Sequence, residues 1–452
     1  MAAAEPLPFH LRGNYAPVMD ELTTFDLPVT GAIPPELDGL YVRNGSNPRS
    51  GASPHWFFGD GMLHGVRIEA GRAKWYRNRW VRTTKFERDA DAMDPATMMD
   101  RTASAANTHI VAHAKRLLAL EEGHFPYLLN AELETIGCEN YGGRLTSAFT
   151  AHPKLCPVTN ELHFFGYGAM QPWLVYHVLD AKGELVHSAE IEVPGPTMMH
   201  DFMITRDHAI FMDLPVVFDL GAAMRGEVPL RWDPSYGARI GILPRRGTNA
   251  DVRWFDIDPC YVFHPLNSYV DGNKVICDVG RHEYMWRDSM NDFSPSYLWR
   301  WTFDLATGQV SEQQLDELSH GFPRVDDRVM GLRHRYGWAV QPRKRNEDFF
   351  DSPGMVVKYD LTTGAKSAHD FGANGQPGEF VFAEAGATAA EDEGYALGFV
   401  YDKARSGSDL VILDASNPSA KPLATIALPR RVPHGFHGSW VRSTQLPNGG
   451  GR

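Results

Sequence analysis

Short runs of β-branched and aromatic residues, each closed by turn-forming residues, dominate this sequence. One run covers residues 39–43 and is followed by Asn44-Gly45, a dipeptide that favours a tight hairpin turn. Similar runs occupy residues 116–120, 162–167, 173–178, 209–214, 274–279, 298–303, 355–360, 395–401 and 410–414. Short strands at this density favour an all-β architecture, which is a sandwich, a barrel or a propeller.

Several of these runs end in an aspartate that begins a turn. The aspartates are Asp180, Asp304, Asp360 and Asp414. Hairpins in any β protein produce similar turns, so the aspartates support a propeller without requiring one. Irregular segments interrupt the pattern at residues 88–106, 215–250 and 281–297. In a propeller these segments would be loops or short helices over one face, with a helical turn at residues 219–224.

The composition is that of an ordinary soluble globular protein. The chain has 452 residues, of which 43% are hydrophobic and 22% are charged. Because large β architectures can extend this far as one unit, we expect a single domain over residues 1–452, with a disordered tail at residues 445–452. The formal net charge of −12 argues against a nucleic-acid partner, since phosphates require basic patches.

The N-terminus and the cysteines favour a cytoplasmic location. Residues 1–17 do not resemble a signal peptide, and no apolar stretch of about 18 residues could span a membrane. The cysteines are Cys138, Cys156, Cys260 and Cys277. They form no C-x-x-C pair, which argues against a zinc ribbon or a thioredoxin-type motif. Scattered cysteines are typical of core positions in a reducing cytoplasm.

Four histidines have distinctive local sequences. They are His152 in Thr150-Ala-His-Pro-Lys154, His200 in Met198-Met-His-Asp-Phe202, His264 in Val262-Phe-His-Pro-Leu266, and His437 in Gly435-Phe-His-Gly438. A lone histidine usually bonds a backbone carbonyl, but four neutral imidazoles can also hold a redox-active divalent metal and leave coordination positions free. The H-E-x-x-H spacing of zinc proteases is absent. The remaining possibility is a dispersed site, for which the converging inner strands of a propeller supply the geometry.

Motifs along nearly the whole chain resemble those of the carotenoid cleavage oxygenase family. This family includes the retinal pigment epithelium retinoid isomerase, bacterial apocarotenoid oxygenases and stilbene-cleaving dioxygenases. The matching segments are residues 39–48, 56–62, 106–109, 119–123, 150–154, 322–324, 379–381 and 431–438. The resemblance implies a seven-bladed β-propeller with a dome of loops and helices over one face. It also implies one Fe(II) per chain, held by four histidines on the propeller axis.

Matching motif to motif assigns roles to particular residues. The implied iron ligands are His152, His200, His264 and His437. Ligand histidines usually donate their second N–H to a carboxylate, and the resemblance gives this role to Glu122 and Glu379. Thr108 matches a threonine near the oxygen site, although it could equally be an ordinary strand residue.

One position departs from the family pattern. The family's third glutamate would stand directly before Phe322-Pro323, where this chain has Gly321. That glutamate usually supports the ligand that matches His264, so we expect weaker iron binding here. A severe loss would leave an inactive protein.

The chemistry implied by the resemblance is oxidative alkene cleavage, in which O2 adds across one C=C bond and gives two carbonyl products. Stilbene-cleaving relatives carry a lysine where this chain has Glu121, and a carboxylate would not stabilise a phenolate. We therefore expect a carotenoid or apocarotenoid, with a stilbene or phenylpropenoid as the alternative. A non-catalytic propeller that binds an apolar ligand or a protein is the second alternative.

The remaining expectations concern the substrate path and the surroundings of the protein. Candidate tunnel residues are Phe57, Phe58, Trp80 and Phe436. An apolar patch within residues 214–228 could contact a membrane at its periphery, although a loop packed on the dome explains it as well. We expect a monomer.

Overall fold

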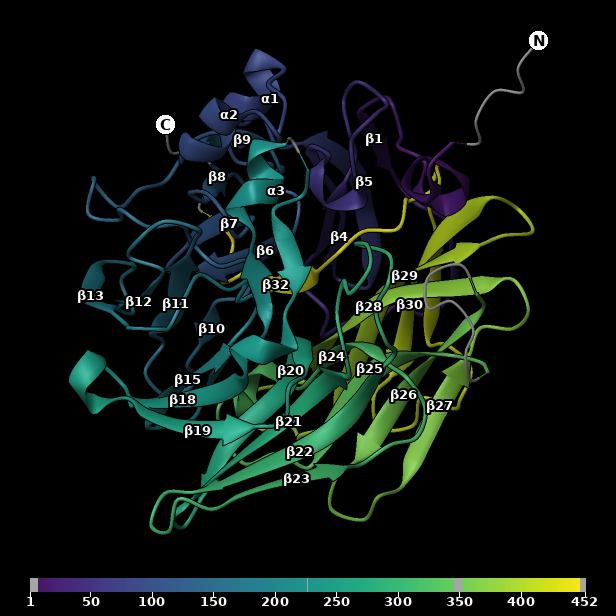
Figure 1. The fold of residues 1–452 in the computed structure, drawn as a ribbon. Helices are drawn as coiled ribbons and strands as arrows, with labels where there is room; N and C mark the ends of the chain where they lie inside the picture. Colours follow the sequence, from purple (N-terminus) through teal and green to yellow (C-terminus); the bar gives the residue numbers. More distant parts are fainter. Residues whose placement is uncertain (1–6, 226, 345–351, 448–452) are drawn as a thin grey trace.

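The computed structural model describes residues 7–225, 227–344 and 352–447. Seven of its sheets are arranged around one axis, so the chain is a seven-bladed β-propeller, as expected (Figure 1). Within each blade the strands follow one another as antiparallel neighbours. The innermost strands contact one another around the axis and line its centre.

Each of the first four blades has four or five strands, ordered from the propeller axis outward. The first contains β32 (Gly438–Arg442), β3 (Gly39–Ser46), β4 (Gly61–Glu69), β5 (Arg72–Trp80) and β1 (Leu22–Phe25). The second contains β6 (His109–His113), β7 (Arg116–Leu120), β8 (Tyr127–Leu129) and β9 (Thr135–Cys138). The third contains β10 (Lys154–Leu155), β11 (Leu162–Tyr167), β12 (Leu174–Leu179) and β13 (Leu185–Glu190). The fourth contains β14 (Met203–Ile204), β15 (His208–Asp213), β18 (Ala238–Pro244) and β19 (Arg253–Ile257).

The last three blades follow the same order. The fifth contains β20 (Tyr261–Asp271), β21 (Lys274–His282), β22 (Ser296–Asp304) and β23 (Val310–Gln314). The sixth contains β24 (Gly321–Arg324), β25 (Tyr336–Pro342), β26 (Gly354–Asp360) and β27 (Lys366–Asp370). The seventh contains β28 (Gly375–Glu384), β29 (Gly394–Asp402), β30 (Gly407–Asp414), β31 (Ala424–Ala427) and β2 (Val29–Gly31).

The two ends of the chain close the ring. The C-terminal strand β32 pairs with β3, so that Gly39 lies opposite Arg442 and Arg43 opposite Gly438. At the outer edge of the seventh blade, β2 from the N-terminal region pairs with β31. Strands from opposite ends of the sequence therefore share two neighbouring blades, and backbone hydrogen bonds within these two blades hold the ring closed.

The core is divided among the interfaces between blades. Seven clusters of buried apolar side chains each join two neighbouring blades. Between the sixth and seventh blades, for example, Trp338 and Val356 pack against Phe380. Each such side chain stabilises the fold by roughly 1.5–3 kcal/mol when fully buried. The inner and middle strands are buried on both faces, which explains runs such as β3 in which every residue is buried.

The aspartate turns mark the same position in different blades. They follow the third strand of the third, fifth, sixth and seventh blades and lead to the next strand outward. In each, the carboxylate accepts backbone N–H groups of the turn, as Asp360 does from Thr362 and Thr363. Asn130 plays the same part in the second blade. The aspartates therefore recur in the sequence because the same turn recurs in several blades of the propeller.

Segments before the innermost strands, together with the segment between β15 and β18, form a dome over one face of the propeller. The dome contains α1 (Thr84–Arg88), α2 (Pro95–Met99), α3 (Leu220–Met224) and the hairpin of β16 (Val216–Phe218) and β17 (Leu230–Trp232), as Figure 1 shows. The short 3₁₀ helices are η1 (Phe9–Leu11), η2 (Gly13–Tyr15), η3 (Trp56–Phe58), η4 (Pro234–Tyr236), η5 (Asn249–Asp251) and η6 (Asp327–Val329). The helical turn predicted at residues 219–224 is confirmed as α3.

Two expectations from the sequence are corrected. The segment 215–250 is not irregular throughout, because β18 within it is a regular strand of the fourth blade. The predicted disordered tail does not begin at residue 445, because Leu446 packs into the cluster between the first and second blades. The rest of that predicted tail, residues 448–452, lies outside the described residues.

The cysteines and the helices complete the description. All four cysteines are free, and Cys156, Cys260 and Cys277 are buried as expected, whereas Cys138 is exposed at the end of β9. No helix in the described part of the chain is both long enough and apolar enough to cross a membrane.

Candidate metal centre

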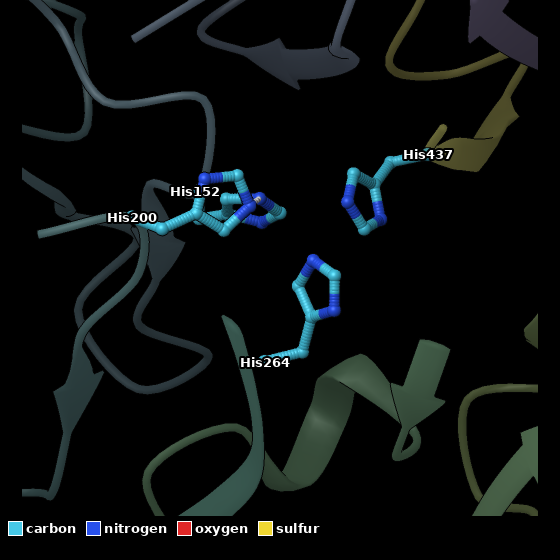
Figure 2. A group of neighbouring side chains, drawn as sticks. All are labelled: His152, His200, His264 and His437. Atoms are coloured by element: carbon cyan, nitrogen blue, oxygen red, sulfur yellow. Dashed lines mark hydrogen bonds between the residues drawn. The ribbon is translucent and has the colours of Figure 1, made fainter. Parts of the chain in front are cut away.

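The four predicted histidines meet on the propeller axis. His152, His200 and His437 lie just before the innermost strands β10, β14 and β32, and His264 lies within β20. Each therefore stands near the dome end of an innermost strand, where neighbouring strands converge. One ring nitrogen from each histidine lies within 4.8 Å of the others, and the four side chains project toward a common centre from separate segments (Figure 2).

The arrangement of the ring nitrogens fits a bound cation. The Nε2 atoms of His152 and His200 are 3.0 Å apart. Because Nδ1 of His200 donates to Glu122, its Nε2 presents a lone pair to this centre. The Nε2 of His264 is buried and has no hydrogen-bond partner among the described residues. Buried nitrogens that face one another in this way need a partner. One metal ion, about 2.1 Å from each nitrogen, would serve as the partner of all of them.

Burial favours the neutral form of two of the imidazoles. Loss of solvent, reinforced by the neighbouring histidines, lowers the pKa of His152 and of His264 well below the usual value. Only a neutral imidazole has a free lone pair, so the environment favours the form that ligates a metal. The donor set is suited to a divalent transition metal.

Glu122 and Glu379 each bond one of the imidazoles. The Nδ1–H of His200 donates to Oε2 of Glu122 at 2.5 Å, and Oε1 of the same carboxylate accepts the hydroxyl of Tyr167 at 2.7 Å. The Nδ1–H of His437 donates to Oε1 of Glu379 at 3.0 Å. These bonds fix the tautomer and the orientation of each ring, so that Nε2 faces the centre.

Glu379 is the more deeply buried of the two carboxylates. Its Oε2 accepts the backbone N–H of Gly438 at 2.7 Å, and Arg324 lies 3.7 Å from Oε1. Burial alone would raise the pKa of Glu379, but His437 and Arg324 outweigh it and lower this pKa to about 2. Glu379 is therefore ionised whenever the protein is folded near neutral pH.

His264 lacks a carboxylate, in agreement with the prediction made from Gly321. Neither ring nitrogen of His264 has a hydrogen bond among the described residues, and its ring stacks on Phe322 with the centroids 5.8 Å apart. The neighbouring His320 is also buried, and neither of its ring nitrogens has a partner there. The region where the third glutamate was expected is therefore aromatic.

A glutamate at position 321 is expected to tighten metal binding. The Gly321→Glu substitution introduces a carboxylate at the motif position that supports the matching histidine, at the first residue of strand β24. We expect an affinity for Fe(II) about 10-fold higher, measured by competition with a chelator. Gly321→Gln, which adds similar bulk without charge, is the matched control. Equal or weaker binding by Gly321→Glu would show that His264 does not lack support.

Several residues near the centre escaped the sequence-based prediction. Tyr167 is one, because it lies in a run that is typical of any strand. His109 is another: its Nδ1 bonds the carbonyl of Ala151 at 2.9 Å, and its ring centroid lies 5.3 Å from that of His437. His109 lies within one of the motifs used for the resemblance, which was the available signal. Thr108 lies beside the cluster through its backbone, since its carbonyl accepts the N–H of His437 at 3.0 Å.

An aromatic wall lies beside the imidazoles on the dome side. Phe263 contacts His200 edge to face, and the rings of Trp286, Phe57 and Phe436 continue the wall at centroid distances of 5.8, 6.1 and 5.8 Å. Phe57 and Phe436, two of the candidate tunnel residues, thus contact each other. Trp80 and Phe58 do not join this wall in the described structure. Trp80 packs against Phe86, and Phe58 packs against His55.

The opposite side of the centre contains many charged side chains. A cavity of about 350 Å³ extends from His152, His264 and His437 along the innermost strands, away from the dome. Its charged lining residues are Lys154, Asp201, Arg324, Asp326, Asp327, Arg328, Glu379, Glu384 and Arg442. The two sides of the histidine cluster therefore differ sharply, with aromatic rings toward the dome and ionic side chains along the axis.

The apolar segment at residues 214–228 is mainly packed inside the dome. Leu214 and Val216 belong to the cluster between the fourth and fifth blades. Helix α3 is the exception, because its Leu220 and Met224 are 55% and 89% exposed. Within the described residues of this segment, the large apolar side chains that are exposed are those of this helical tip.

Comparisons with known proteins agree with this geometry. A carotenoid cleavage oxygenase of Mycobacterium tuberculosis is 38% identical, over 98% of this chain and 99% of its own length. Carotenoid 9,10(9',10')-cleavage dioxygenase 1 of Arabidopsis thaliana is 33% identical, over 97% and 91% of the two chains. An isoeugenol monooxygenase of Pseudomonas putida is also 33% identical, over 95% and 97%.

Solved structures share the same fold. The lignostilbene dioxygenase of Pseudomonas brassicacearum superposes with a TM-score of 0.89 at 28% identity, over 97% of this chain and all of that one. The cobalt-substituted ACO of Synechocystis gives a TM-score of 0.85 at 26% identity, over 95% and 98% of the two chains. The model of the retinal pigment epithelial membrane protein family matches residues 15–442. With its propeller, its four converging histidines and relatives along its whole length, the chain belongs to this family of carotenoid cleavage oxygenases and is an enzyme of the dioxygenase type.

Proposed function

We propose that this chain is an Fe(II)-dependent dioxygenase that cleaves a conjugated C=C bond of a carotenoid or apocarotenoid and gives two carbonyl products. The observation that carries the proposal is the convergence of four imidazole nitrogens within 4.8 Å at the centre of the propeller. The ligands would be His152, His200, His264 and His437. Relatives named as carotenoid cleavage enzymes support the substrate class.

Different residues around the centre have different roles in the proposed reaction. A ferrous ion bound by the four imidazoles would supply the redox chemistry that allows O2 to react with an alkene. Glu122 and Glu379 hold two of the rings in the tautomer that presents Nε2. The aromatic wall beside His200 keeps water away and offers stacking surfaces to a flat polyene. Thr108 borders the same space as a candidate neighbour of O2.

The overall reaction is balanced without a reductant. One C=C bond breaks and two C=O bonds form, so both atoms of O2 enter the products. The carbon atoms supply the electrons that reduce O2. No titratable group of the protein has to be consumed in this reaction.

The surroundings of Glu121 favour a polyene over a phenol. Its Oε1 accepts the backbone N–H of Gly123 at 2.7 Å, and its Oε2 bonds Nδ1 of His124 at 2.6 Å. This carboxylate is therefore held within its own loop, at the position where stilbene-cleaving relatives carry a lysine. A phenolate would find no cation from this residue. A stilbene or phenylpropenoid remains the second candidate, because a lignostilbene dioxygenase and an isoeugenol monooxygenase are among the similar proteins.

A substrate panel tests the proposal. The purified protein, reconstituted with Fe(II), is incubated with carotenoids, apocarotenals, 4-hydroxystilbenes and isoeugenol under ¹⁸O2, and product masses are measured. We expect two carbonyl products from a polyene, each carrying one ¹⁸O. Cleavage of hydroxystilbenes or isoeugenol alone would assign the second substrate class. Failure of the wild-type protein to bind iron would refute the metal chemistry itself.

A peripheral membrane contact would suit a substrate that is dissolved in lipid. The exposed apolar side chains of the dome that could make it are Leu220 and Met224 on α3, together with Met99 on α2, which is 71% exposed. We propose that these side chains enter a membrane surface and expect the protein to cosediment with phosphatidylcholine vesicles. The double substitution Leu220→Ser and Met224→Ser should reduce binding several-fold. Val158→Ser, at an exposed loop beyond the far end of β10, is the control, and equal loss in both proteins would contradict the assignment.

A further inference from the structure

The four imidazoles differ in the support they receive. His200 and His437 each donate to a glutamate, and His264 donates to none of the described residues. At His152, Nδ1 lies 3.7 Å from Oδ2 of Asp201. Nε2 of His152 faces His200, so Nδ1 lies on the side of the ring that points away from the centre. Nδ1 is also the atom through which His200 and His437 bond their glutamates.

Asp201 is fixed in place by its own contacts. The residue is only 2% exposed. Its Oδ1 accepts the ammonium group of Lys154 at 2.7 Å and the backbone N–H of Phe202 at 2.6 Å, and its Oδ2 is directed toward His152. A buried carboxylate requires a partner of opposite charge, and Lys154 supplies it. Lys154 follows His152 by two residues, so in extended chain both side chains lie on the same side.

We propose that Asp201, held by Lys154, is the positioning carboxylate of His152. This inference rests on the metal-binding function proposed above. Since Lys154 neutralises Asp201, the pair orients the imidazole without adding net negative charge to the centre. Asp201 also directly follows His200, so the pair links the segments that lead into the third and fourth blades. The pair thereby fixes the imidazoles of His152 and His200 relative to each other, with their Nε2 atoms 3.0 Å apart.

The test compares metal binding in variants of the full chain. The variants are Asp201→Asn and Lys154→Met, with Glu122→Gln as the comparator that removes an established hydrogen bond to a ligand ring. Asp213→Asn is the matched control, because Asp213 is a fully buried carboxylate that pairs with Arg239 at 2.9 Å and bonds Thr197 and Tyr236 instead of a cluster histidine. Co(II) serves as the probe, since its visible spectrum reports the ligand geometry. Affinity is measured by chelator competition, and thermal unfolding is followed without metal.

The expected result is a Co(II) affinity lowered about 10-fold or more in Asp201→Asn, with an altered visible spectrum. Lys154→Met should show a change of the same sign, and Asp213→Asn should lose thermal stability but keep the wild-type affinity and spectrum. If Asp201→Asn fails to fold, Lys154→Met decides the question. Wild-type Co(II) affinity and spectrum in the folded variants, with a loss in Glu122→Gln, would overturn this inference alone. Absence of Co(II) and Fe(II) binding by the wild-type protein would overturn the proposed function as well.

Discussion

Replacement of His437 by alanine is expected to weaken metal binding by more than about 100-fold and to abolish alkene cleavage. The substitution removes one of the four donors, whereas loss of a supporting carboxylate alone typically costs about 10–100-fold. It also leaves Glu379 without the imidazole whose Nδ1–H it accepts at 3.0 Å. Metal content after reconstitution with Fe(II), together with O2 consumption, measures both effects.

A second buried histidine provides the control for this prediction. His177 lies in β12 of the third blade, where Ser147 and Ser188 bond its two ring nitrogens at 2.8 Å each. His177→Ala removes a buried imidazole of the same size but leaves the cluster intact, so it should lower stability and retain stoichiometric iron. Stoichiometric iron in His437→Ala would mean that His437 is not a ligand.

Glu379→Gln is expected to lower both stability and metal affinity. The isosteric amide removes the negative charge that Arg324 faces at 3.7 Å. Because the amide nitrogen cannot accept a hydrogen bond, either Gly438 or His437 loses its acceptor. Arg324 would keep only Asp327, which also lies 3.7 Å away, and the loss of one carboxylate beside this largely buried cation costs up to about 3 kcal/mol of unfolding free energy. Metal affinity should fall about 10–100-fold. Chemical denaturation of the metal-free protein and chelator competition measure the two effects separately.

The stability effect of Glu379→Gln depends on pH in a defined direction. The folded-state pKa of about 2 lies below the ordinary value of 4.5. The ionised carboxylate therefore stabilises the fold fully above about pH 5, and this contribution is lost as the pH falls toward 2. The difference in unfolding free energy between wild type and variant should shrink over that range. A difference that stays constant down to about pH 3 would contradict the role of the charge.

Asp278→Asn separates a general loss of buried charge from an effect on the metal. Asp278 is a buried carboxylate between Arg300 and His334 in the fifth blade, at 2.7 and 3.2 Å, outside the histidine cluster. We expect this variant to lose stability and to keep the wild-type metal affinity. A comparable loss of affinity in both variants would show that Glu379 acts only through the fold.

The sequence carried enough information for the class of fold but not for the number of blades. Strand-ending aspartates such as Asp180 and Asp360 revealed hairpins, and these proved to recur at one position in the repeat. The innermost strands gave little signal, because β10 and β14 each contain only two residues and are surrounded by neighbouring strands. Seven blades followed from the resemblance to a family, since local periodicity cannot count elements that short.

Site residues could be predicted from the sequence where each stands in a distinctive motif of its own. The four histidines and their two glutamates each stand in a distinctive segment, and the structure brings them together. Asp201 was not predicted because its contact crosses between blades: it follows His200 in sequence but faces His152 and Lys154. Trp80 shows the converse limit. An aromatic residue at a strand end does not reveal which side it covers, and here its indole N–H bonds the carbonyl of Asn47 instead of joining the aromatic wall.

The pairing of β32 with β3 has a consequence for how the enzyme is made. His437 immediately precedes β32, which completes the first blade only by pairing with a strand from the beginning of the chain. A nascent polypeptide that has not yet exposed this segment outside the ribosome possesses three of the four imidazoles and an open ring. A metal ion bound by all four imidazoles therefore requires that this segment has been synthesised and that the first blade is complete.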